Sequence, residues 1–299
     1  MEGRELAVIR PALLEGRDRY ERVMEGWVDN TPEDALTHTV RLSDDDRALE
    51  LAVEALPSPS YLIRAARCRA VSGAFDPEVP AGIGRLAGTQ MVGGLSRRVG
   101  ELTGAGAGAG FALGALVEAA RLARQVAKLP RAQAERAAGD ARECWQLDTT
   151  GWIDLPNSCF TYTDAGRSLF GTRAVTTPIQ PDIYSPRPGQ ARVFERRKVA
   201  RLERRDGRLR LFHSMHDNVH GFEVTYEIDL TSDRIVRAEH ITPRLPYMGI
   251  CSEPQRRMGA MLGETADDGL RQRIQTHLGG ESGCAQLYDL TADLLKLLV

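Results

Sequence analysis

The stretch RVFERRKVARLERRDGRLRLFHSMHDNVHGFEVTYEIDLTSDRIVRAEHI, residues 192–241, decides the fold. Its Asp206–Gly207 dipeptide is typical of the tight turn of a β-hairpin. Four segments of the stretch have the composition of strands, namely residues 192–204, 208–212, 222–230 and 234–241. The segments follow one another with short turns between them, so the stretch predicts an antiparallel β-meander.

Helical patterns follow this meander. Pro243 and Pro246 end the sheet, and residues 256–262 and 266–278 have helical spacing of their apolar residues. The chain closes with a further helix predicted over residues 286–298. A meander followed by helices indicates an α+β unit in which the helices pack on one face of the sheet.

An earlier part of the chain repeats this organisation. A shift of 175 positions places Glu78, Gly84, Gly88, Gly94, Leu95, Arg98, Gly104 and Gly108 on Glu253, Gly259, Gly263, Gly269, Leu270, Arg273, Gly279 and Gly283. Further upstream, a shift of 188 positions places Asp29, Asn30, Thr37, Leu42 and Asp45 on Asp217, Asn218, Thr225, Leu230 and Asp233. Many of the shared residues are glycines, which mark backbone conformations that other residues fit poorly.

We therefore predict two tandem related units, each an antiparallel β-meander with helices packed on one face. Residues 1–130 form the first, degenerate repeat, residues 131–190 a linker helix with proline-rich loops, and residues 191–299 the second repeat with the predicted site. In the first repeat, residues 35–42 read as a strand and residues 48–56 as a strand or a short helix.

Composition narrows the class of protein. The 299 residues carry a formal net charge of -2, with 42% hydrophobic and 27% charged residues, which is ordinary for a globular protein. No basic patch indicates nucleic acid, and no long apolar run or signal-peptide core indicates a membrane. The 5 cysteines are an odd number, which favours reduced thiols in the cytoplasm over a disulfide framework.

Histidines are concentrated in the second repeat, which holds His213, His216, His220, His240 and His277. If a loop centred on Asp217–Asn218 joins two strands, His213 and His220 face one another across its mouth, with His216 on the loop. Such imidazoles bind a divalent metal, here zinc or iron, while leaving positions open for water or substrate. The predicted metal ligands are His213, His216, His220, His240 and Cys251.

The alternative is acid–base catalysis without a metal. His216 or His220 takes a proton, Asp217 or Glu239 orients the imidazole, and Tyr226 or Tyr247 hydrogen-bonds a phenol or a developing oxyanion. Surface histidines scattered along a hairpin are the structural alternative to both readings.

The differences between the repeats point to the same residues. With the shift of 188, the three clustered histidines fall on Glu25, Val28 and Pro32, so the first repeat keeps the Asp-Asn turn but no imidazole. With the shift of 175, Cys251 falls on Asp76 and Cys284 on Ala109. These two cysteines are therefore candidate ligands or nucleophiles, the alternative being buried, inert thiols.

No nucleotide motif is present. The glycine-rich run at residues 104–110 follows a predicted helix instead of a strand, and no lysine-serine pair comes after it. We interpret these glycines as structural, and we do not expect nicotinamide or flavin redox chemistry.

The C-terminal half resembles a bacterial family, the domain of unknown function 2889. The resemblance rests on Pro246–Tyr247 with Cys251, Leu262–Gly263, Gly269–Leu270, and Gly279–Gly280 with Gly283–Cys284. It covers residues 192–298 well and residues 61–123 faintly. Family members commonly carry Thr-His after the final cysteine, where this chain has Ala285–Gln286. The resemblance implies companions of aromatic and acyl-thioester catabolism and no defined activity.

We expect an enzyme that acts on a small aromatic catabolite, as a lyase of the retro-aldol or elimination type or as a hydrolase. The alternatives are a non-catalytic metal-binding protein and a scaffold subunit. The expected partners are a small-molecule substrate and, as an open alternative, further copies of the chain, with neither nucleic acid nor membrane.

Overall fold

The computed structural model describes residues 11–298, and this part of the chain forms two compact units. The C-terminal unit combines the described part of Met1–Glu21 with Leu155–Pro178 and Lys198–Val299. The N-terminal unit combines Arg22–Asp154 with Ile179–Arg197. Residues 131–190, predicted as a linker, are thus divided between the two units.

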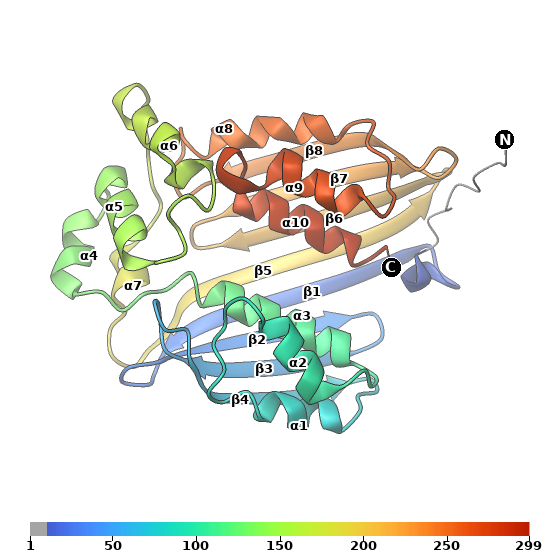
Figure 1. Ribbon diagram of the computed structural model, residues 1–299, viewed down its shortest axis with the longest axis horizontal. Helices are drawn as coiled ribbons and strands as arrows, with labels where there is room; N and C mark the ends of the chain where they lie inside the picture. Colours follow the sequence, from blue (N-terminus) through green and yellow to red (C-terminus); the bar gives the residue numbers. More distant parts are fainter. Residues whose placement is uncertain (1–10, 299) are drawn as a thin grey trace. The chain divides into compact units, whose positions relative to one another are not determined.

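The N-terminal unit is built on a meander. Its strands are β1 (Arg19–Asn30), β2 (Leu36–Asp44), β3 (Ala48–Ala55) and β4 (Ile63–Ser72). Buried and more exposed residues alternate regularly along β3, so one face of the sheet is covered. The covering helices are α1 (Glu78–Gly84), α2 (Leu95–Thr103) and α3 (Ala109–Leu122) (Figure 1). The helices that follow in this unit are α4 (Arg131–Ala137), α5 (Ala141–Gly151) and α7 (Pro181–Tyr184).

The C-terminal unit has the same order of elements. Its strands are β5 (Gln190–Arg205), β6 (Arg208–Asp217), β7 (Gly221–Asp229) and β8 (Arg234–Arg244). They precede α8 (Ser252–Gln255), the 3-10 helix η4 (Arg256–Met261), α9 (Leu270–Leu278), η5 (Gly280–Ser282) and α10 (Ala285–Leu295). The loop segment of this unit carries η2 (Phe160–Tyr162), α6 (Asp164–Ser168) and η3 (Leu169–Gly171), and η1 (Ala12–Leu14) lies near the start of the chain.

The strands are hydrogen-bonded in the order β4-β3-β2-β1-β5-β6-β7-β8, and β1 and β5 each contribute residues to both units. The pairs β1–β2, β2–β3, β3–β4, β6–β7 and β7–β8 are antiparallel. Helices on one face of an antiparallel meander confirm the predicted α+β class.

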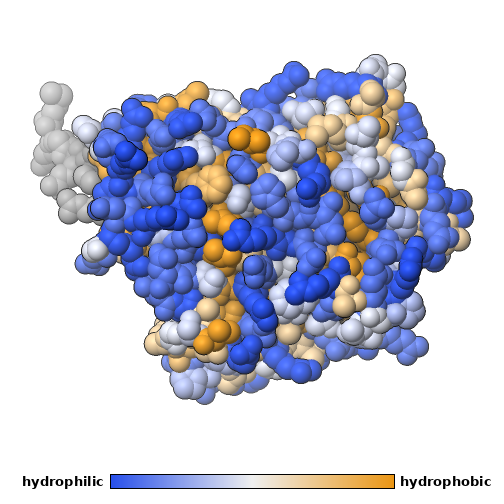
Figure 2. Space-filling model, turned by 180° about the vertical axis from the view of Figure 1, so that it is seen from behind, coloured by the Kyte–Doolittle hydropathy of each residue, from blue (hydrophilic) through white to orange (hydrophobic). Residues whose placement is uncertain are grey.

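Ion pairs between neighbouring strands occupy the uncovered faces, where hydrophilic side chains predominate (Figure 2). In the N-terminal unit Arg41 pairs with Glu50 at 2.6 Å. In the C-terminal unit Glu227 pairs with both Arg208 and Arg237 at 3.0 Å. Alternating charges of this kind are typical of a solvated sheet face, and each exposed pair adds at most about 1 kcal/mol to stability.

Both units close the edge of the sheet with the same backbone contacts. In the N-terminal unit the Ile63 N–H donates to the Thr89 carbonyl at 2.8 Å, and the Gly88 N–H donates to the Ile63 carbonyl at 2.9 Å. In the C-terminal unit Ile235 makes the corresponding bonds with Glu264 at 2.9 Å and Gly263 at 2.8 Å. Gly88 and Gly263 differ by 263 − 88 = 175 positions, whereas Ile63 and Ile235 differ by 235 − 63 = 172, so the shift of 175 relates the loops beside the edge strands and not the strands themselves.

The shift of 188 does not relate equivalent positions. It places Asn30, the end of β1, one residue beyond the end of β6. Within the sheets the strand register gives the equivalence. With Ile63 equivalent to Ile235, the paired strands make Leu36 equivalent to Leu209, a shift of 209 − 36 = 173 positions. His38 then falls on Leu211, and His213 falls on Val40.

None of the helices in residues 11–298 is both long and apolar enough to span a membrane.

Candidate functional site

A buried carboxylate–imidazole pair occupies the turn between β6 and β7. The Asp217 side chain has 0% exposure, and its Oδ1 accepts the backbone N–H groups of Val219 at 2.7 Å and His220 at 2.5 Å. The same oxygen lies 3.1 Å from Nδ1 of the His220 ring, and Oδ2 lies at 3.2 Å. Because an ionised carboxylate only accepts hydrogen bonds, Nδ1 is the donor, and the lone pair of the neutral ring is on Nε2.

The turn is fixed from both sides. The Asp217 N–H donates to the His220 carbonyl at 2.9 Å, and Arg244 at the end of β8 donates to the Asp217 carbonyl. The His220 side chain is 10% exposed and packs beside the Phe222 ring, with 6.2 Å between ring centroids. The prediction of an Asp217–His220 contact thus agrees with the geometry, although Asp217 also caps the turn.

His216 lies on the other face of the sheet. Side chains alternate along a strand, so residues three apart, such as His213 and His216 on β6, point to opposite faces. The His216 side chain is 43% exposed, and its Nε2 lies 3.5 Å from Oε1 of Glu223. His216 therefore does not join the other two histidines.

His213 and His240 share the helix-covered face but not a common centre. His213 is opposite Val224 in the register, and Val224 is in turn opposite His240. Two strand spacings separate the two histidine backbones by about 10 Å. The His213 Nδ1 donates to the Leu290 carbonyl of α10 at 2.9 Å. Burial lowers the pKa of His240, whose Nδ1 has no hydrogen-bond partner within the described residues.

The histidine metal site predicted from the sequence is not assembled in this structure. His213 faces Val224 and α10 instead of His220 across the loop mouth. Among residues 11–298, no group of three or more His, Cys, Asp or Glu side chains is arranged to hold a metal ion. The reason is that His213 and His216 both lie on β6, where side chains alternate between the two faces of the sheet. The prediction had placed His216 on a loop.

The two tyrosines of the predicted site belong to the core. Tyr226 is 3% exposed, its hydroxyl lies 2.9 Å from the Thr291 hydroxyl, and burial raises its pKa. It is opposite Leu211, six residues along β6 from Asp217, which corresponds to about 20 Å. Tyr247 is fully buried and packs edge-on against Tyr162.

A second cluster of polar residues surrounds three cysteines. The sequence predicted only part of this cluster. The Thr161 hydroxyl lies 3.0 Å from the Cys251 sulfur, and the Phe160 N–H donates to the Gly283 carbonyl at 2.9 Å. These contacts bring Cys159 and Cys251 toward Cys284, which immediately precedes α10. We call Cys159, Cys251 and Cys284 the thiol cluster.

Burial dominates the chemistry of the thiol cluster. Desolvation raises the pKa of all three thiols, to about 11 for Cys284, and the charge of an ionised Cys159 further raises the pKa of Cys251 and Cys284. Gln255, 2% exposed, donates through Nε2 to the Cys251 carbonyl at 3.2 Å, while its Oε1 has no hydrogen-bond partner among the described residues. Both Cys251 and Cys284 were singled out from the sequence, whereas Cys159 was not.

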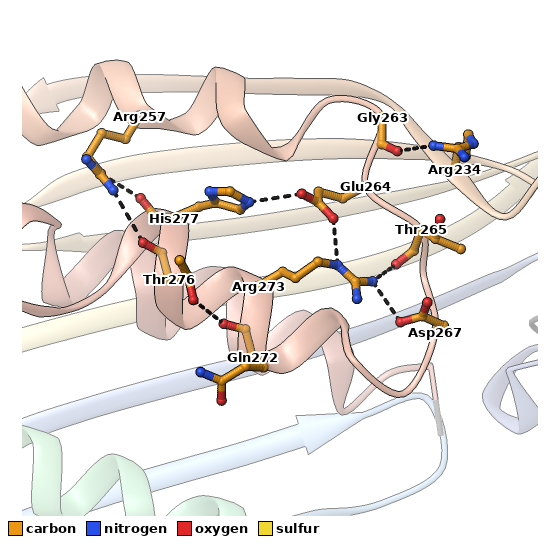
Figure 3. A network of polar contacts seen from close by, with 10 residues as sticks. All are labelled: Arg234, Arg257, Gly263, Glu264, Thr265, Asp267, Gln272, Arg273, Thr276 and His277. Carbon is orange, nitrogen blue, oxygen red and sulfur yellow. Dashed lines mark hydrogen bonds and ion pairs between the residues drawn. The ribbon is translucent and has the colours of Figure 1, made fainter.

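His277 belongs to a different network (Figure 3). Glu264 lies between the His277 ring, with Oε1 to Nε2 at 2.9 Å, and the Arg273 guanidinium, with Oε2 to Nε at 2.6 Å. Arg273 also pairs with Asp267 at 2.7 Å, and Arg257 donates to the His277 carbonyl at 2.7 Å. These contacts tie α9 to the preceding loop, which gives His277 a structural role.

Arg244, which donates to the Asp217 carbonyl, is the last residue of β8, and Cys251 follows it by 251 − 244 = 7 positions. Residues 196–299 match the family model described as protein of unknown function (DUF2889). The match confirms the resemblance for the C-terminal part, and no family covers the N-terminal half. The DUF2889 segment includes Asp217, His220, Cys251 and Cys284 but not Cys159. Comparisons with curated proteins and with solved structures give no match.

Proposed function

We propose that this protein is an enzyme in which His220, oriented by Asp217, moves a proton to or from a small organic substrate. The observation that carries the proposal is the fully buried Asp217 carboxylate bonded to Nδ1 of the ring. This contact selects the tautomer whose Nε2 accepts a proton, which is the arrangement that a general base needs. The proposed reaction is non-redox, a lyase or hydrolase step on an aromatic catabolite.

Substitutions of the pair test this proposal. In Asp217→Asn the amide oxygen still accepts the turn N–H groups, but the side chain has no negative charge to stabilise the protonated ring, and its NH₂ group, in the place of Oδ2, donates toward Nδ1 where the carboxylate accepts. We expect Asp217→Asn and His220→Ala to lower turnover by about 10²- to 10⁴-fold, the usual contribution of a general base. The assay uses a panel of p-nitrophenyl esters and β-hydroxy-β-aryl acids.

His216→Ala is the matched control, because His216 lies on the same hairpin but on the opposite face. It should leave turnover unchanged. Nitrogen NMR of the His220 ring should show the Nδ1-protonated tautomer in the parent protein and a mixture in Asp217→Asn. No turnover of any panel member by the parent protein, or full turnover by His220→Ala, would count against the proposal.

A further inference from the structure

The thiol cluster gathers around a single hydroxyl group of the C-terminal unit. Thr161 Oγ1 lies 3.0 Å from the Cys251 sulfur and is also hydrogen-bonded to the Cys159 side chain. One oxygen in contact with both sulfurs keeps the two thiols within a few ångströms of each other. Cys251 is buried, and Cys159 and Cys284 are partly buried, so these thiols are largely removed from water.

Backbone N–H groups point at the sulfurs from two directions. Cys159 is hydrogen-bonded by the backbone of Thr161 and Ala285, and Cys284 by the backbone of Gln286 and Leu287 in the first turn of α10. Hydrogen bonds of this kind favour the thiolate over the thiol, and the positive end of the helix dipole acts in the same sense.

We propose that Cys159 and Cys251 bind a copper(I) ion as a thiolate pair, with Cys284 as a third thiol beside it. Soft thiolate ligands select copper(I), whereas zinc sites in proteins need four ligands. A thiolate pair requires no preassembled group of three residues. Binding releases one proton from each coordinating thiol.

Gln255 supplies an independent reason to expect a ligand at this place. Its side chain is almost completely buried, it is hydrogen-bonded to the Cys284 thiol, and its Oε1 has no protein partner within residues 11–298. A buried polar atom without a partner costs about 1–3 kcal/mol. Oε1 would accept a hydrogen bond from a water molecule beside the ion.

The N-terminal unit supplies an internal control, because the shift of 175 places Asp76 and Ala109 at the positions of Cys251 and Cys284. It cannot form the same site, although it holds two other cysteines, Cys68 and Cys144. The full chain should therefore bind about one equivalent of copper(I) at this site.

The experiment is a titration of the reduced full-length protein with copper(I) under anaerobic conditions, against a chromophoric copper(I) chelator. We expect about one equivalent to be bound, and Cys159→Ser and Cys251→Ser to weaken binding more than about a hundredfold. Cys68→Ser and Cys144→Ser, the matched controls, should leave it unchanged. A parallel titration with zinc(II) should show no tight binding.

Proton release by the parent protein provides the test if a serine variant fails to fold. Binding of one copper(I) ion by two thiols should release about two protons, measured by pH change in weakly buffered solution. Equal affinity in the double variant Cys159→Ser/Cys251→Ser, binding without proton release, or tighter binding of zinc(II) than of copper(I) would each overturn the proposal. These outcomes are independent of the turnover assay for His220.

Discussion

His38 is completely buried in β2, where its Nδ1 donates to the Val53 carbonyl at 3.2 Å. Its Nε2 has no hydrogen-bond partner in the described part of the chain. Burial disfavours the charged ring and lowers the pKa of His38 to about 4. A histidine in the unfolded chain has a pKa of about 6.5. Between these two pH values the ring therefore binds a proton in the unfolded state but not in the folded state.

The sign of the resulting pH dependence follows from this difference. Above about pH 6.5 the His38 ring is neutral in both the folded and the unfolded state, so it does not change the free energy of unfolding. As the pH falls toward about 4, protonation of the ring increasingly favours the unfolded state. The free energy of unfolding should fall by up to about 3 kcal/mol over this range on account of His38 alone.

His38→Gln tests this account, because glutamine can still donate to the Val53 carbonyl but does not titrate. We expect the free energy of unfolding, measured by urea denaturation, to depend less on pH between 7 and 4 in this variant. His216→Gln, at the partly exposed position on β6, should behave like the parent protein. A parent-like pH profile in His38→Gln would show that His38 carries no proton linkage.

At the scale of elements, Gly283 decides how α10 meets the end of α9. A Cβ at this position would overlap the Leu278 carbonyl, which is backbone and cannot rotate away. The same carbonyl accepts the Cys284 N–H at 2.9 Å, so Gly283 lies inside a closed backbone turn. The glycine is needed here for close approach and not for an unusual backbone angle, because its φ is −109°.

We expect Gly283→Ala to lower the free energy of unfolding by about 1–3 kcal/mol, the usual cost of overpacking. Gly259→Ala is the control, because no atom outside its immediate neighbourhood lies within 4 Å of a Cβ built there. It should change stability by less than about 0.5 kcal/mol. Thermal denaturation of both variants gives the comparison, and equal stability would show that the turn relaxes.

The sequence predicts those strands and turns whose own residues show a turn motif or a regular alternation of apolar and polar side chains. The hairpin at Asp206–Gly207 is confirmed as the β5–β6 turn, and residues 48–56 are a strand, not a helix. The strands β1 and β4 were not predicted. Only Ile63 and Ala66 of β4 are buried, and its other positions include three arginines, so the usual alternation is missing from the amino-acid pattern.

The residues of the candidate site also differ in how well the sequence predicts their contacts. Asp217 and His220 are close in sequence, and a turn brings them together, so their contact was predictable. Cys159 and Cys251 are 92 positions apart (251 − 159). Their approach depends on how a proline-rich loop packs onto the C-terminal unit, which no local periodicity reports.

At the scale of the whole molecule, the two units can be compared residue by residue, because backbone contacts and strand register show which positions are equivalent. The turn after the second strand is the same in both units, because Asp44 Oδ1 accepts the N–H groups of Asp46 and Arg47 at 3.0 and 2.9 Å, as Asp217 Oδ1 accepts those of Val219 and His220. Asp44 therefore corresponds to Asp217, and Arg47 stands in the place of His220. The comparison thus leaves the imidazole of His220 and the thiol of Cys251, which falls on Asp76, as features of the C-terminal unit alone.

The C-terminal unit extends beyond the segment that matches the family model, and this difference can be tested. The match begins at residue 196, but the unit also includes Leu155–Pro178. Tyr162 and Phe170 from that loop pack edge-on against the fully buried Tyr247, with ring centroids 6.2 and 6.4 Å apart. A fragment of residues 196–299 would expose Tyr247, and burial of such a ring contributes about 2–3 kcal/mol.

We expect a fragment of residues 155–299 to be more stable than one of residues 196–299, because only the longer fragment can cover Tyr247 and the Cys251 sulfur. Thermal unfolding followed by circular dichroism should show a cooperative transition at higher temperature in the longer fragment, and a dye that binds apolar surface should fluoresce more with the shorter one. Phe170→Ala in the longer fragment should lower the transition temperature toward that of the shorter fragment. If both fragments unfold at the same temperature, the loop segment adds nothing to the stability of the unit, and the thiol cluster would not be held in place by it.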